Sequence, residues 1–424
     1  MDATVIGICI LSALAGSGMG LFSGLVPGIH VNTLASVMMA AYPALLGSMS
    51  GIVDADYVPL AVCSCIMSAS VVHSFVDFVP SVFIGAPDSE DAVSVLPGHR
   101  LLLKGEGMAA VRAAAIGSLV GAVATVLLSI PLQWLLLHGL DGILSGLTPV
   151  VLVAASAAIL SDSFRRGNGA WGLMAFAVSG MLGLACMTLP IQMSGILGDG
   201  SIMLPMLTGL FGLPVLMSSS SSGRVPVQRD RVGDPVGPWP GLKGVLMGTL
   251  AGWFPGITST VGASMSAAVF PERDPARFIS VVASVGTVTS ILSLVVLSVS
   301  GDGRSGTALV IGEIAGSSLR GFASEWFLVL LLCTAIASVA GYSLTIASGK
   351  LMGSLICRIR PDVLGRSVMV LLVVIVLVLT GPVGIIILIC STVVGHIPEY
   401  CGTGRIVLCG CLILPVLLFK LGLA

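Results

Sequence analysis

Two ionisable side chains stand inside an apolar stretch of the sequence. His73 and Asp77 lie within Val71–Pro80, VVHSFVDFVP, which otherwise carries no charge. Residues four apart share one face of a helix, and ionisable groups inside a membrane segment are costly and mark function by default. The pair is therefore a candidate for carrying a proton or holding a coupling cation. The alternative is a polar pair at the mouth of the segment, near Pro80.

Pro-Gly pairs interrupt two other apolar stretches, and polar residues follow each pair directly. A helix that starts at such a break presents unpaired backbone N–H groups and about half a positive charge, which suits a carboxylate or phosphate. The alternative is that both breaks only kink helices for packing. The predicted anion-binding residues are Pro27, Gly28, His30, Asn32, Thr33, Pro255, Gly256, Thr258, Ser259 and Thr260.

The two interrupted stretches, 16–43 and 244–271, repeat one pattern without a gap. At the offset of 228 residues that aligns Gly28 with Gly256, eleven residues recur. The first-half members are Gly16, Met19, Gly20, Gly24, Pro27, Gly28, Ile29, Ala35, Ser36, Ala40 and Pro43. Interrupted hydrophobic segments at corresponding places in two halves point to the binding site of a secondary transporter. An odd number of crossings per half would make the repeat inverted, and transporter precedent favours that arrangement.

Other polar motifs give little support for an enzyme or a metal site. Asp88, in the acidic cluster 87–91, is a further candidate for coordinating Na⁺, although a solvated loop with helix-capping carboxylates explains it as well. The ten cysteines lack zinc or thioredoxin spacing and are expected to be buried. Neither a phosphate loop nor a zinc-protease motif occurs. We expect no catalytic residues, no metal site and no cofactor beyond Na⁺ or H⁺ as coupling ion.

The composition is that of an integral membrane protein. Of the 424 residues, 56% are hydrophobic and only 9% are charged, against about 25% charged in soluble domains. Glycine, at 54 residues, is abundant, and small residues let helices approach closely in lipid. Long apolar runs argue against a β-barrel. A net charge of −1 gives no case for nucleic acid.

These properties predict an all-α polytopic protein with two pseudo-symmetric membrane repeats, 1–217 and 242–424, joined by a polar linker at 218–241. The expected membrane segments, some of them half-helices or re-entrant hairpins, are 3–27, 29–46, 57–84, 108–138, 142–162, 168–190, 193–217, 242–255, 257–270, 277–300, 307–319, 322–347, 366–380, 382–397 and 403–422. The first reads as a retained segment and not as a signal peptide. Lys and Arg concentrate in the connections near 85–107, 218–243 and 349–366, which the positive-inside rule assigns to the cytoplasm.

Taken together, the chain resembles the tripartite tricarboxylate transporter permease family, meaning its large membrane subunit, and looks like a divergent, archaeal-type branch. The matching residues are Gly20–Gly28 with its echo Gly248–Gly256, and the run GAPDS…LPGHR…KGEG…AAAIGSLVG from Gly85 to Gly121. The resemblance implies a multi-pass transporter of the cytoplasmic membrane that carries carboxylates. It also implies a small membrane subunit and an extracytoplasmic binding protein as partners.

The charges near the breaks limit the substrate. Two helix ends supply about one positive charge, and no Lys or Arg stands beside them. Moving a trianion inward against an inside-negative potential costs about 7 kcal/mol per 100 mV, so uptake requires co-transported cations. A mono- or dicarboxylate therefore fits better than citrate. Two alternatives remain: a translocase for a lipid phosphate such as polyprenyl phosphate, and a structural subunit without a substrate.

Overall fold

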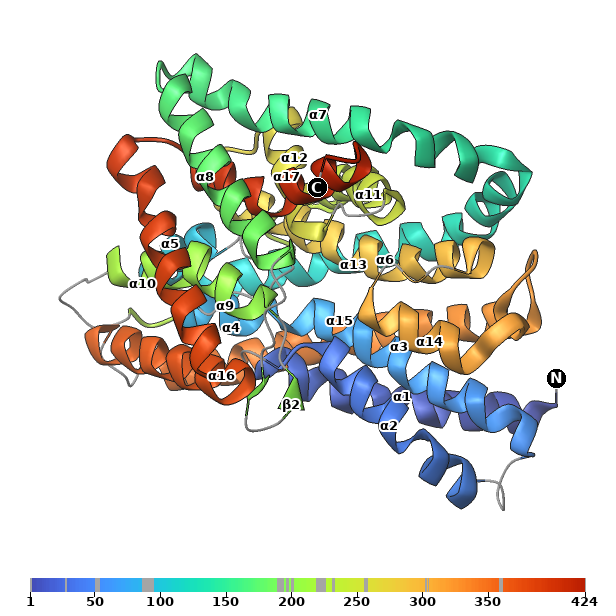
Figure 1. Ribbon diagram of the computed structural model, residues 1–424. Helices are drawn as coiled ribbons and strands as arrows, with labels where there is room; N and C mark the ends of the chain where they lie inside the picture. Colours follow the sequence, from blue (N-terminus) through green and yellow to red (C-terminus); the bar gives the residue numbers. More distant parts are fainter. Residues whose placement is uncertain are drawn as a thin grey trace.

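The computed structural model is a bundle of long helices (Figure 1), as the composition predicts. It describes residues 2–26, 29–49, 54–85, 95–188, 194–195, 198–199, 202–218, 226–230, 233–254, 258–301, 303, 305–357 and 361–423. Within these ranges the β-structure is one two-residue antiparallel ladder, β1 (Ser194–Gly195) with β2 (Gly198–Asp199).

The helices of the first half are α1 (Ala3–Leu25), α2 (Val31–Met49), η1 (Ala55–Tyr57), α3 (Val58–Val76), α4 (Phe78–Ile84), α5 (Val95–Leu103), α6 (Gly107–Leu135), η3 (Leu136–Leu140), α7 (Asp141–Arg165), α8 (Gly169–Thr188), α9 (Met203–Leu207), η4 (Thr208–Gly212) and α10 (Leu213–Ser218). Those of the second half are α11 (Pro238–Trp253), α12 (Ser259–Val269), α13 (Pro275–Ser300), α14 (Gly306–Ala315), η5 (Gly316–Leu319), α15 (Glu325–Ile356), α16 (Pro361–Cys401), η6 (Arg405–Cys409) and α17 (Gly410–Lys420).

Two helices form the interior of the bundle. Among the described residues, eight helical segments are long and apolar enough to cross a membrane. The apolar windows of the segments that contain α3 and α13 are each 94% buried, whereas the other six windows are half buried or less. Ser74 of α3 and Thr287 of α13 lie 3.4 Å apart, oxygen to oxygen. The fold is therefore built around the contact of α3 with α13.

Glycines bring the first helix of each half close to its inner helix. A Cβ on Gly16 would lie 2.1 Å from the carbonyl oxygen of Cys65, and one on Gly24 would lie 2.9 Å from the Cβ of Val76. The contacting residues have increasing numbers on both helices, from Gly16 with Cys65 to Gly24 with Val76, so α1 and α3 run parallel. Since the Cβ atom is missing, the two backbones pack directly against each other.

The pair α11 and α13 repeats this packing. A Cβ on Gly244 would lie 2.4 Å from the Cβ of Ser284, and one on Gly252 would lie 3.1 Å from Leu292. Here too the numbers of the contacting residues increase along both helices, so α11 and α13 run parallel. The glycine spacing that recurs in the sequence therefore serves one function in both stretches, which is close packing against an inner helix.

The contacts of α6 and α15 establish the direction of the two inner helices. Gly117 of α6 packs on Ser280, and Gln133 donates from Nε2 to Ser298 Oγ at 2.8 Å, so α6 runs parallel to α13. On α15, Gly341 packs on Phe75 and Gly353 on Phe83, so α15 runs parallel to α3 and α4.

Gln133, near the end of α6, also donates to the carbonyl of Gly321 before α15 begins, at 3.1 Å. Val111, near the start of α6, packs against Gly349 late in α15. Thus α6 and α15 are antiparallel. It follows that α3 and α13 are antiparallel as well.

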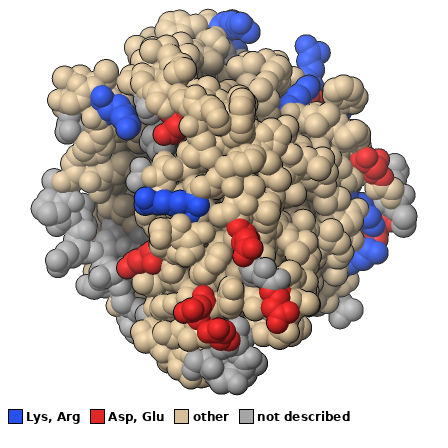
Figure 2. Space-filling view, turned by 90° about the vertical axis from the view of Figure 1, so that its right-hand side faces the viewer, with Lys and Arg blue, Asp and Glu red and all other residues tan. Residues whose placement is uncertain are grey.

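The two ends of the bundle differ in charge. At the end where α1, α3 and α15 begin, called the acidic end below, the exposed charged residues include Asp2, Asp54, Asp56, Glu313 and Glu325. Figure 2 looks onto this end and shows acidic side chains gathered over its lower half. The opposite, basic end carries Arg100, Lys104, Arg112, Arg165, Arg166, Lys243, Arg273, Arg277 and Lys350.

The three connections expected on one side of the membrane do meet at the basic end. Arg112 donates to Asp230 from Nη2 at 2.7 Å, and Lys350 Nζ lies 3.4 Å from the same carboxylate. Arg229 N donates to Gly105 O at 2.8 Å. The hydrogen bond from Arg112 holds the pKa of Asp230 below its usual range. The linker is thus tied to the first and third connections.

Several expected boundaries differ from the structure. Residues 193–217, predicted as one membrane segment, contain the β1–β2 ladder and then α9, η4 and α10. Pro and Gly at 190, 195, 198, 200 and 205 explain why no single helix forms there. The segments predicted at 366–380 and 382–397 are two arms of α16, which bends at Gly381 (φ 69°). The polar connection near 349–366 begins later, because α15 continues to Ile356.

Gly16 and Gly18 provide a matched test of the glycine packing. A Cβ on Gly16 would collide with the backbone of Cys65, whereas one on Gly18 would meet nothing within 4 Å. We expect Gly16→Ala to destabilise the protein by about 1–3 kcal/mol, as overpacking does, and Gly18→Ala to be neutral or slightly stabilising. Thermal unfolding in detergent measures both. Equal melting temperatures for the two variants would contradict the close α1–α3 packing.

Candidate functional site

Two histidines lie together where the first stretch is interrupted. Helix α1 ends at Leu25 and α2 begins at Val31. The ring of His30, in the connection, lies 5.1 Å from the ring of His73 on α3, centroid to centroid. His73 is buried, and its Nδ1 lies 2.9 Å from Ser23 Oγ in the last turns of α1. Ser23 cannot be recognised from the sequence, because a serine within a glycine-rich helix is not distinctive.

Asp77 lies beside the same turn of α1. Its side chain is 3% exposed, and its backbone N–H donates to His73 O at 3.0 Å across the junction of α3 and α4. A Cβ on Gly24 would lie 3.3 Å from the Asp77 nitrogen. The structure therefore brings two of the three predicted coupling residues, His73 and Asp77, next to the end of α1 that precedes the first break.

Asn32 has a contact in the second half of the chain. Its Oδ1 accepts a hydrogen bond from Thr307 N at 3.0 Å, and its own N–H donates to His30 Nδ1 at 3.1 Å. The Asn32 side chain thereby caps the first turn of α14, where Ser305 also accepts from Ala308 N. The start of α2 is thus joined to the start of α14.

The second interruption begins where α11 ends at Trp253. Thr258 caps α12, because its Oγ1 accepts a hydrogen bond from Val261 N at 3.4 Å. Ser259 and Thr260 follow inside the first turn and are buried, at 4% and 0% exposure. Buried hydroxyls at a helix N-terminus add polar groups to the backbone N–H groups of the first turn, and both kinds of group can bind an anion.

One apolar cluster extends from the end of α1 to α12. Leu25, the last residue of α1, packs against the apolar cluster that contains Ala263 of α12. Thr33 lies in the first turn of α2. The remaining predicted residues, Pro27, Gly28, Asp88, Pro255 and Gly256, are outside the described residues. Whether both breaks open into one chamber therefore stays a prediction.

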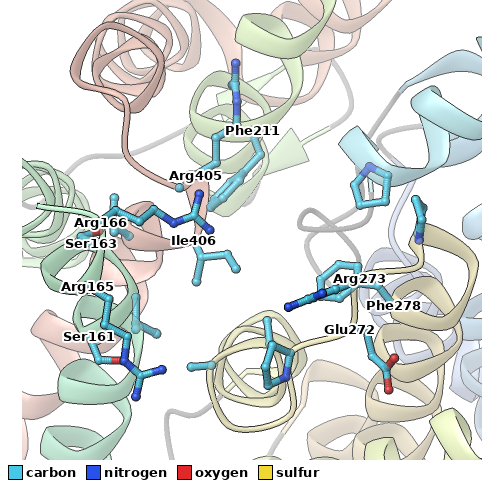
Figure 3. A pocket seen from close by; sticks show the side chains of 18 of the residues that line it. Ser161, Ser163, Arg165, Arg166, Phe211, Glu272, Arg273, Phe278, Arg405 and Ile406 are labelled. Atoms are coloured by element: carbon cyan, nitrogen blue, oxygen red, sulfur yellow. The ribbon is translucent and has the colours of Figure 1, made fainter. Parts of the chain in front are cut away.

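A separate cavity, which sequence reasoning missed, lies at the basic end (Figure 3). Its volume is about 500 Å³, and it lies between the ends of α5, α7, α12 and η6 and the start of α13. Five arginines line it: Arg100, Arg165, Arg166, Arg273 and Arg405. They come from distant parts of the sequence. Only Arg165 and Arg166 are adjacent in the sequence, so no local motif predicts that the five arginines lie together.

These side chains can do two kinds of chemistry. Imidazole and carboxylate groups can exchange a proton or, with hydroxyl oxygens, hold a small cation. Helix N-termini and arginines bind anions. Within the described part of the chain, His, Cys, Asp and Glu side chains form no group of three or more that could hold a metal ion. Proton exchange, binding of a small cation and binding of an anion are thus the chemistry that these groups offer.

Comparisons with known proteins agree with a multi-pass helical membrane protein. Over 310 residues the chain is 28% identical to an uncharacterized protein of Methanocaldococcus jannaschii, covering 71% of this chain and 72% of that protein. No solved structure matches it. The model of the tripartite tricarboxylate transporter TctA family matches residues 10–410, nearly the whole chain. The chain therefore belongs to the tripartite tricarboxylate transporter TctA family, a family of membrane transporter permeases and not of enzymes.

Proposed function

We propose that this protein is a secondary transporter that moves a carboxylate-type organic anion across the cytoplasmic membrane, coupled to Na⁺ or H⁺. The anion is held at the two interrupted helices. The observation that carries the proposal is that each half has an interrupted helix at the same place relative to its inner helix. Such paired half-helices in two repeats form substrate sites near the bilayer midplane in secondary transporters.

The helix contacts support an inverted relationship between the halves. Gly20 faces Val72 and Gly248 faces Val288, so α1 on α3 corresponds to α11 on α13. Helix α6 packs on α13 as α15 packs on α3. Because α3 and α13 are antiparallel, a rotation about an axis in the membrane plane would exchange the halves. This is the geometry in which alternating access arises from rocking one repeat against the other.

The two halves differ in the polar residues beside the breaks. Since Val72 corresponds to Val288 and Val76 to Leu292, the counterparts of His73 and Asp77 are Thr289 and Ser293. The ionisable pair is thus present in the first half and replaced by hydroxyls in the second. We assign the coupling ion to the first break and the closest anion contacts to the hydroxyls of Thr258, Ser259 and Thr260.

The family relationship and the charges support the rest of the proposal. Members of the family work with a small membrane subunit and a binding protein and carry organic anions, and we propose the same partners here. The basic end would face the cytoplasm by the positive-inside rule. The near-neutral surroundings of the breaks favour a mono- or dicarboxylate.

Removing one buried hydroxyl tests the anion site. We expect wild-type protein in liposomes to take up at least one carboxylate under an imposed Na⁺ or H⁺ gradient. Thr260→Val should reduce uptake about tenfold, because a buried hydrogen bond to a charged group is worth about 1.5–3 kcal/mol. The control is Thr345→Val, which removes an equally buried hydroxyl that bonds within α15.

Uptake by Thr260→Val at the wild-type rate would contradict the proposed anion site. If wild-type protein moves no carboxylate under either gradient, the transport proposal fails. Retention of a polyprenyl phosphate in that case would indicate the lipid-phosphate alternative.

Neutralising Asp77 tests the coupling site. An amide neither takes up a proton at Asp77 nor compensates a cation there, so Asp77→Asn should abolish gradient-driven accumulation while leaving exchange of internal for external anion. Radiolabelled uptake and counterflow in the same liposomes separate the two activities. Glu325→Gln, at an exposed position on the acidic end, is the control and should behave as wild type. Undiminished accumulation by Asp77→Asn would rule out this residue as the coupling group.

A further inference from the structure

The cavity at the basic end is lined by an excess of positive charge. Its five arginines come from α5 (Arg100), the end of α7 (Arg165 and Arg166), the connection from α12 to α13 (Arg273) and η6 (Arg405). The lining contains one acidic residue, Glu272. Figure 3 shows Arg165 and Arg166 on one wall, with Arg273 and Glu272 across the cavity from them.

Within the described part of the chain, acidic side chains neutralise only part of this charge. The Glu272 carboxylate forms an ion pair with Lys243, outside the cavity lining. Arg405 donates from Nη2 to Glu399 at 3.3 Å, while its Nη1 is buried and makes no hydrogen bond among the described residues. Neither Arg165 nor Arg273 forms an ion pair with any described residue. A buried, unsatisfied N–H group of a cation is costly unless a ligand accepts from it.

The positive-inside rule explains why arginines lie at this end, but not why they converge on one cavity. Lys104, Arg277 and Lys350 lie at the same end without lining it. A cleft lined by one sign of charge concentrates ions of the other sign. Guanidinium groups bind carboxylate and phosphate oxygens in bidentate fashion. Apart from Ser161 and Ser163, the remaining lining, including Phe211, Phe278 and Ile406, is apolar and suits a carbon skeleton.

We propose that this cavity binds a small anion that carries two or more carboxylate or phosphate groups. The same chemistry can be supplied by a free polyanion or by the headgroup of an anionic lipid. The site is separate from the breaks but structurally connected to the second one. Helix α12 begins at the second break, at Ser259, and its far end supplies Ala267 and Ala268 to the cavity wall, about 13 Å away at 1.5 Å per residue. The proposal does not depend on where the transported anion binds.

Binding to the purified protein tests the site. Calorimetric titration in neutral detergent would use citrate and pyrophosphate as multivalent probes and acetate as a monovalent one. We expect the multivalent probes to bind at low ionic strength and acetate to bind at least tenfold more weakly. Arg165→Gln/Arg273→Gln should weaken citrate or pyrophosphate binding at least about tenfold, the factor for one charge-assisted hydrogen bond. Both side chains are exposed, so the fold should tolerate the change.

Arg277→Gln is the control, because it removes an exposed arginine in the first turn of α13 that does not line the cavity. It should leave binding within about twofold, since a charge exposed to solvent outside the cavity is screened. Citrate binding that is lost in Thr260→Val but kept in the double arginine variant would place the anion at the break and overturn the cavity site. This outcome separates the cavity from the proposed transport site.

Lipid nanodiscs distinguish the two sources of the anion. Native mass spectrometry would count phosphatidylglycerol molecules retained by the wild type and by the double variant. Loss of retained lipid in the double variant, without binding of either soluble probe to the wild type, identifies a headgroup site. If the double variant changes neither lipid retention nor citrate and pyrophosphate binding, the proposal is wrong.

Discussion

The structure depends on direct backbone contact between helices that carry glycine where they meet. In a bilayer the lipid tails are as apolar as the side chains, so helices gain little by hiding apolar surface from lipid and associate through close packing. Gly16, Gly117 and Gly244 each bring a carbonyl or a Cβ of the neighbouring helix to a distance that no side chain would allow. These contacts hold α1, α6 and α11 against the inner pair, α3 and α13. The polar groups beside both breaks are positioned by that arrangement.

Because α3 and α13 are almost wholly buried, the polar residues on them lie away from lipid. His73 and Asp77 are tolerated at this depth since the last turns of α1 approach closely enough for Ser23 to reach His73. The same close approach leaves Gly24 against the backbone of Asp77. A bulkier α1 would separate the pair from the first break. In this region the small residues of α1 therefore both allow close helix packing and place polar groups next to His73 and Asp77.

Charge is distributed along the bundle in a way that suits an anion. Acidic residues gather at the end where α1 and α3 begin, and arginines at the other. Between them, Thr258, Ser259 and Thr260 place hydroxyl groups at the start of α12, where the proposed anion site has no fixed positive charge. Helix α12 runs from the second break to the arginine-lined cavity, so the two proposed anion sites lie at its two ends. A permease must release its substrate as well as bind it. Two proposed anion sites that differ in positive charge are compatible with both steps.

The sequence by itself determined the class of protein, the places where helices are interrupted and the internal repetition. These are local properties: a low charged fraction excludes a water-exposed domain, and a Pro-Gly pair deep within an apolar run favours the end of a helix near it. His73 and Asp77 could also be selected from sequence, because charge within an apolar run is conspicuous. Residues 193–217 could not be assigned, since apolar composition alone does not distinguish a membrane segment from a buried hairpin with short helices. Only the tertiary structure decided the direction of α3 relative to α13, the contact of Asn32 with Thr307 and the gathering of five arginines. Each of these depends on segments far apart in the chain, and no pattern within a segment records which neighbour it will meet.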